Sequence, residues 1–110
     1  MVKVDNTFEN NPIKIGQNSQ ENDDLVKESK DTDIWFHLAS FPSCHVIIEC
    51  SEDFPLDNIM IYYCAQIVKQ NTKYRNVPNL KVNYTKIKNI QRTEQLGCVI
   101  MKGKFYTITM

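Results

Sequence analysis

Apolar residues recur every three or four positions between Pro55 and Asn71, and no other feature restricts the fold of this chain as strongly. This spacing places the apolar side chains on one face of an α-helix, and that face must be buried against another element. Proline is tolerated in the first turn of a helix, so Pro55 is compatible with its start. We predict one main amphipathic helix over about residues 55–71, with a buried face of Leu56, Ile59, Met60, Tyr63, Cys64, Ile67 and Val68.

Segments with the alternation and turn punctuation of β-strands flank this helix on both sides. A short helix is expected in residues 18–30, because Asn18 stands three positions before Glu21, the spacing of an N-terminal cap. The turn Lys102-Gly103-Lys104 predicts a terminal β-hairpin. The expected strands are about Lys3–Phe8, Pro12–Gly16, Asp33–Ala39, His45–Cys50, Leu80–Thr85, Gly97–Met101 and Phe105–Met110.

The order of these elements predicts an α+β fold with a mixed β-sheet and the main helix on one face. At 110 residues the chain is long enough for one hydrophobic core, so we expect residues 1–110 to form a single domain.

The two central strands are expected to form an antiparallel hairpin. Ile34, Phe36 and Leu38 then point to one face of the sheet, since successive side chains of a strand alternate. The length of the connection places His37 beside His45 on the other face, with Trp35 near Ile47.

Charge is divided unevenly along a chain that is neutral overall. Residues 1–54 contain four Lys against eleven Asp and Glu, whereas residues 55–110 contain nine Lys and Arg against Asp57 and Glu94. A basic region attracts phosphate groups even in a neutral protein. The candidate RNA-binding residues in the basic half are Lys69, Lys73, Tyr74, Arg75, Lys86, Lys88 and Arg92.

Aromatic residues offer a second means of RNA binding, by stacking on unpaired bases. Phe36 and Tyr84 fall in strand patterns and are predicted to be core residues. Tyr74 lies in a polar segment and is predicted to be exposed. For Trp35 both roles, core residue and stacking surface, stay open.

Patterns typical of enzymes and metal sites are missing. The four cysteines are not arranged as Cys-x-x-Cys, and the sequence has no glycine-rich phosphate loop or nucleophile elbow. We expect His37 and His45 to form hydrogen bonds that fix the loop around Pro42, in preference to binding a metal. Asp33 is expected to accept structural hydrogen bonds. The chain is therefore predicted to be a non-enzyme without metal or cofactor, and cytoplasmic, since no segment has the pattern of a membrane span or signal peptide.

Several motifs resemble the NFACT-R family, in matching order and spacing. They are Ile15-Gly16-Gln17-Asn18 with Asn22-Asp23, then Asp33-Ile34-Trp35-Phe36-His37, Pro42-Ser43-Cys44-His45-Val46, Val82-Asn83-Tyr84-Thr85 and Gly97-Cys98-Val99-Ile100. The resemblance covers roughly residues 8–109, and the family usually has Arg where this chain has Gln17. It marks Gly16, Asn18, Asn22, Asp33, Trp35, His37, Pro42 and His45 as motif residues.

The resemblance implies a non-catalytic α+β domain of the kind found in ribosome quality-control factors, where it contributes to binding of tRNA and the large ribosomal subunit. The expected partner is therefore RNA, either tRNA or ribosomal RNA. The alternative is a protein-interaction adaptor that binds no nucleic acid, and pairing of edge strands would allow a homo-oligomer.

Overall fold

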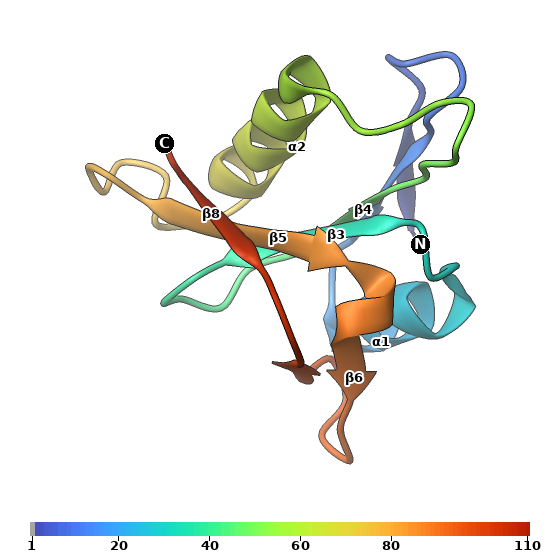
Figure 1. The fold of residues 1–110 in the computed structure, drawn as a ribbon. Coiled ribbons are helices and arrows are strands. Elements are labelled where there is room, and N and C mark those ends of the chain that lie inside the picture. The colour runs from blue at the N-terminus through green and yellow to red at the C-terminus, as the bar shows by residue number, and fades with distance from the viewer. Residues whose placement is uncertain (1) are drawn as a thin grey trace.

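The computed structural model describes residues 2–110, which form a six-stranded sheet with one helix on each face (Figure 1). The sheet has the strand order β1-β2-β4-β3-β5-β8, and β6 pairs with β7 in a separate small sheet. The predicted α+β class is confirmed. The elements are β1 (Lys3–Asp5), β2 (Ile13–Gly16), α1 (Ser19–Glu28), β3 (Ile34–Leu38), β4 (His45–Ile48), α2 (Asn58–Gln70), β5 (Lys81–Lys86), a 3-10 helix (Ile87–Asn89), β6 (Ile90–Arg92), β7 (Val99–Met101) and β8 (Tyr106–Thr109).

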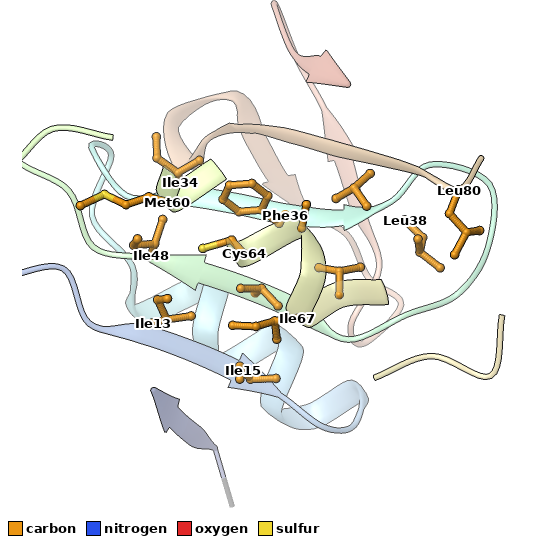
Figure 2. Packing of buried hydrophobic residues seen from close by; sticks show 14 residues of the cluster. Ile13, Ile15, Ile34, Phe36, Leu38, Ile48, Met60, Cys64, Ile67 and Leu80 are labelled. Carbon is orange, nitrogen blue, oxygen red and sulfur yellow. The ribbon is translucent and has the colours of Figure 1, made fainter. Parts of the chain in front are cut away.

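The face of the sheet beneath α2 carries the larger hydrophobic core (Figure 2). Ile34, Phe36 and Leu38 of β3 lie on this face, as their alternation predicts. They pack with the buried residues of α2, which are Met60, Cys64, Ala65, Ile67 and Val68. Burial of this apolar surface is the main force that holds α2 on the sheet.

The predicted main helix is confirmed, but two of its details were wrong. It begins at Asn58 because the carboxylate of Asp57 accepts a hydrogen bond from the Met60 backbone N–H at 2.8 Å, so Pro55 lies outside the helix. Ile59 was expected in the buried stripe and is 71% exposed. The stripe is centred on Met60, Cys64 and Val68 instead, and this helical phase turns Ile59 toward solvent.

The opposite face of the sheet packs against α1. Trp35 and Ile47, which are register partners, form a smaller core there with Leu25, Val26 and Ile87. The N-terminus of α1 is capped as predicted, since the side chain of Asn18 accepts from the backbone N–H of Glu21 at 2.9 Å. Trp35 is only 3% exposed and is therefore a core residue.

The strand pairings correct two predictions. The terminal hairpin is wrong, because β8 pairs with β5, where Ile108 stands opposite Val82, and β7 pairs with β6. The pairing with β5 lets Ile108 extend the α2-side core. The sheet is not mixed either, since every pairing of neighbouring strands in residues 2–110 is antiparallel.

Candidate nucleic-acid interface

A junction between the start of α1 and the start of β4 brings together several motif residues. The side-chain oxygen of Asn22 accepts a hydrogen bond from the His45 backbone N–H at 3.1 Å. Gly16 lies so close that a Cβ atom added there would collide with this same Asn22 oxygen. The junction therefore requires glycine at 16, and it holds the capped N-terminus of α1 against the sheet.

The two histidines and the tryptophan form one network on the α1 side of the sheet. Trp35 Nε1 donates a hydrogen bond to His45 Nδ1 at 3.2 Å, and its ring stacks on His37 with 5.5 Å between centroids. The His37 and His45 rings meet edge to face at 4.9 Å, which confirms that they are side by side. Burial lowers the pKa of His45 to about 3 and also lowers that of His37. Both rings are therefore neutral at pH 7.

The other two motif residues lie apart from this network. Asp33 precedes the opposite end of β3, where its carboxylate accepts from the Lys30 backbone N–H at 3.0 Å. Pro42 is exposed in the loop between β3 and β4. That loop is held by Ser43, whose hydroxyl oxygen accepts from the Leu38 N–H at 3.1 Å. Asp33 thus stabilises a turn and contacts neither histidine.

A groove runs between the N-terminus of α1, the loop after β3 and the segment that follows α2. Lys73 lines it together with polar residues that include Gln17, Asn18, Ser19 and Ser43. The motif segment 16–18 and the basic segment after α2, far apart in the sequence, therefore meet in one surface depression. We call Lys69, Lys73 and Arg75 the α2-end group.

Tyr74, which was expected to be exposed, packs against the neighbouring loop instead. Its ring stacks on Phe41 with centroids 4.2 Å apart, and Lys73 Nζ lies 5.3 Å from the Tyr74 ring centroid. The stack ties the segment after α2 to the β3–β4 loop. Tyr74 therefore positions Lys73, and its ring face is already occupied by Phe41.

The other basic candidates lie at the opposite end of β5, beside β6 (Figure 1). Arg92 is paired with Asp23 of α1, with Nη2 and Oδ2 separated by 2.7 Å. This hydrogen bond lowers the pKa of Asp23 and raises that of Arg92. We call Lys86, Lys88 and Arg92 the β6-end group. The basic candidates thus form two groups at the two ends of a strand, not one continuous face.

Reasoning from the sequence missed a cleft on the α1 side of the sheet and the residue Asn83 in its floor. The cleft has a volume of about 520 Å³ and is bordered by the loop after β3 and by residues 95–99. Asn83 stands directly opposite His37 in the pairing of β3 with β5. The sequence feature that could have revealed Asn83 is its position as a polar residue between Val82 and Tyr84. Its side chain points away from the α2-side core, because side chains alternate along a strand.

The cysteines and histidines do not form a metal site in the described part of the chain. Within residues 2–110, no three His, Cys, Asp or Glu side chains gather closely enough to hold a metal ion. Burial raises the pKa of both Cys44 and Cys50 to about 11, so these thiols stay protonated at neutral pH.

Within residues 2–110, no helix has the length and apolar character needed to cross a membrane.

These features define a small α+β domain with a fixed helix–strand junction and a polar groove that Lys73 lines. The chain belongs to the NFACT-R family, since the family model described as NFACT protein RNA binding domain matches residues 1–108.

Two kinds of curated relative match most of this chain. Coiled-coil domain-containing protein 25 of Danio rerio is 31% identical over 88 residues, and that of Bos taurus is 34% identical over 90 residues. Each match covers 76% of this chain and 42% of the relative. The Rqc2 homolog RqcH of Bacillus subtilis is 31% identical over 81 residues, which are 73% of this chain and 14% of RqcH. The matches thus span less than half of each relative.

A solved structure has the same fold. It is the C-terminal part of the fibronectin/fibrinogen-binding protein from Streptococcus suis, with a TM-score of 0.79 at 22% sequence identity. The match covers 90% of this chain and 40% of the solved chain. At this level of identity the likeness establishes the fold alone.

Proposed function

We propose that this protein is a non-catalytic RNA-binding module that binds tRNA or ribosomal RNA through the α2-end group and the adjoining groove. The observation that carries the proposal is the meeting of Lys73 with the family motif at residues 16–18 in this groove. The family match and the likeness to RqcH support an RNA or ribosome partner. Residues 1–110 would act as one unit in the cytoplasm, without a metal or cofactor.

The electrostatics of the α2-end group support contact with phosphates. Within residues 2–110, none of Lys69, Lys73 and Arg75 forms an ion pair with a carboxylate. Lys73 and Arg75 are exposed, and Arg75 has only a long contact to the Thr72 carbonyl oxygen at 3.5 Å. Their charges are therefore free to replace the counterions of an RNA backbone, which supplies most sequence-independent affinity.

The experiment is RNA binding by a variant in which Lys69, Lys73 and Arg75 are all replaced by Glu. Three reversed charges in one field are expected to weaken binding of tRNA at least ~100-fold at low salt. The control is Lys102→Glu with Lys104→Glu, a pair of exposed lysines outside the groove, and it should bind nearly as the parent does. Fluorescence anisotropy with labelled tRNA measures both. Equal losses of tRNA affinity in the two variants would indicate a diffuse attraction between RNA and any cation. Unchanged binding by the triple variant would refute the proposal.

A protein-binding adaptor is the second candidate. Phe54, Ile59 and Tyr62, near the start of α2, are 44%, 71% and 56% exposed, which is typical of surfaces that contact other proteins. An adaptor, or a homo-oligomer, would keep its partners at high salt and after RNase treatment, whereas phosphate binding weakens steeply with salt. A pull-down from lysate with and without RNase separates the two functions.

A further inference from the structure

The cleft on the α1 side of the sheet has the size and composition of a small-molecule site. Its volume of about 520 Å³ lies within the range of roughly 300–1,000 Å³ that is usual for ligand pockets. Phe41, Leu96 and Met101 supply apolar surface, while His37 and Asn83 supply polar groups. These two polar residues are register partners on neighbouring strands, so their side chains stand next to each other.

The imidazole of His37 is held as a flat surface at the edge of this cleft. One of its faces is covered by Trp35, whose ring is tilted by only 4° from that of His37. The hydrogen bond from Trp35 to His45 fixes the tryptophan in turn. Because His37 lines the cleft and is partly exposed, the part of its ring that Trp35 and the edge-to-face contact with His45 leave uncovered is available to a planar ligand.

The hydrogen-bonding character of His37 follows from its contact with the backbone. Its Nδ1 lies 2.7 Å from the Leu38 carbonyl oxygen, which can only accept, so Nδ1 carries the proton. In the neutral ring Nε2 is then an acceptor. Within residues 2–110 no hydrogen bond reaches Nε2. His37 therefore offers one unused acceptor.

Asn83 complements this acceptor with a donor. Its side-chain oxygen accepts from the Thr107 hydroxyl at 2.8 Å, which orients the amide. The NH₂ group has no hydrogen-bond partner in the described part of the chain, and it is not sealed from solvent. The unused acceptor and the unused donor thus belong to register-paired residues that both line the cleft. Each of the four RNA bases carries an adjacent donor and acceptor on its Watson–Crick edge that would match this pair.

The cleft and the groove of the α2-end group are neighbours. Four residues, Ser19, Asn22, Pro42 and Ser43, line both of them. A nucleotide whose phosphate lies in the groove is therefore within reach of the cleft with its base. Only an unpaired base has a free Watson–Crick edge, so the cleft would select single-stranded segments.

We propose that this cleft binds one unpaired nucleobase, stacked beside the His37 ring and hydrogen-bonded through its Watson–Crick edge to His37 Nε2 and the Asn83 amide. This inference rests on the proposed RNA-binding function but uses a separate set of residues. Free nucleosides carry no phosphate, so they test the cleft without the contribution of the α2-end group.

The test is a titration of the whole 110-residue chain with uridine, 5-methyluridine and 3-methyluridine, followed by NMR of the Trp35 indole and His37 ring protons. Uridine and 5-methyluridine are expected to bind with dissociation constants on the order of 1 mM. 3-Methyluridine lacks the N3–H that His37 Nε2 would accept, so it should bind about tenfold more weakly. Absence of uridine binding at about 10 mM, or equal binding of uridine and 3-methyluridine, would overturn the proposal.

Two variants separate the cleft from the rest of the protein. His37→Phe keeps a flat ring but loses the acceptor, so it should bind uridine as weakly as the parent binds 3-methyluridine, with unchanged near-ultraviolet circular dichroism of Trp35 as the test of folding. Tyr62→Ala, a change of an exposed aromatic residue on α2, should bind uridine as the parent does. The α2-end triple variant should keep uridine binding while it loses RNA. If the unchanged protein binds RNA but binds no nucleoside, the proposal for the cleft is refuted while the proposed RNA-binding function stands.

Discussion

The two basic groups at the ends of β5 differ in what surrounds them. In the α2-end group, Lys73 lines a polar groove, and none of the three cations has a carboxylate partner within residues 2–110. In the β6-end group, Arg92 is held by Asp23, and Lys88 lines a groove that also contains Asp31. The acidic N-terminal half therefore pairs with one cation of the β6-end group, Arg92, and with none of the α2-end group within residues 2–110. The two ends therefore differ in their neighbouring carboxylates and not in their number of cations.

The largest expected effect concerns the junction that shapes the groove. Gly16→Ala should destabilise the protein by about 2–4 kcal/mol, because the added methyl group collides with Asn22 and breaks its buried hydrogen bond to His45. Gly103, near the β6 end, is the matched control. A Cβ there meets only ordinary contacts, so Gly103→Ala should cost roughly 1–2 kcal/mol through its positive φ. Denaturant unfolding measures both, and a smaller loss at Gly16 would contradict the junction.

Local patterns in the sequence were sufficient to predict several elements of the fold, but not the contacts of Gly16, Asn22 and His45 in this junction. The cap at Asn18, the helix expected over about residues 55–71 and the pairing of Trp35 with Ile47 all follow from interactions between residues close in the sequence or from strand alternation. The terminal hairpin was wrong because both of its strands found partners elsewhere. The turn at Gly103 is compatible with a hairpin, but the burial of Ile108 beside Val82 depends on tertiary packing that turn chemistry does not report.

A second change adds charge to the groove. Gln17 and Lys73 line the same groove, and Gln17→Arg should strengthen RNA binding about fivefold at low salt, because one further phosphate contact contributes on the order of 1 kcal/mol. Gln20→Arg makes the same change of charge on α1 at an exposed position outside the groove lining. Anisotropy titrations should show a clear gain for Gln17→Arg only. A similar gain for both variants would mean that total charge, and not the groove, controls affinity.

The smallest effect is expected at the β6 end. Asp23→Asn removes the carboxylate that holds Arg92, so it should lower the melting temperature while it raises RNA affinity no more than about twofold. A gain as large as that of Gln17→Arg would show that the β6 end is a second RNA site.

The same pair gives a dependence of stability on pH. The pKa of Asp23 is lowered by its hydrogen bond to Arg92, so its stabilising contribution is present above its ordinary pKa of 3.8 and is lost as the pH falls through the lowered value. The melting temperatures of the parent and of Asp23→Asn should therefore differ at pH 7 and converge as the pH falls below 3.8 and through the lowered pKa. A constant difference across this range would contradict the assignment to Asp23.

The separation of the basic half into an α2-end group and a β6-end group could not be predicted from the sequence. Lys69 and Arg92 belong to the same basic segment, yet the strand β5 lies between them and places them at its two ends. The Asp23 that pairs with Arg92 comes from the acidic half. Tyr74 was misplaced for a similar reason, since its partner Phe41 lies in a distant loop. Ion pairs and ring stacks between distant segments leave no periodic signal in the sequence.

The most direct test of the central claim compares the salt dependence of RNA binding for two charge-matched variants. One carries Glu at Lys69, Lys73 and Arg75, and the other carries Glu at Lys86, Lys88 and Lys102. Each phosphate contact contributes about 0.7–0.9 to the slope of log affinity against log salt concentration. If the α2 end holds the RNA, the first variant should have a slope smaller by about two to three, while the slope of the second stays close to that of the parent. Equal reductions in both slopes, or a larger one in the second variant, would contradict the account.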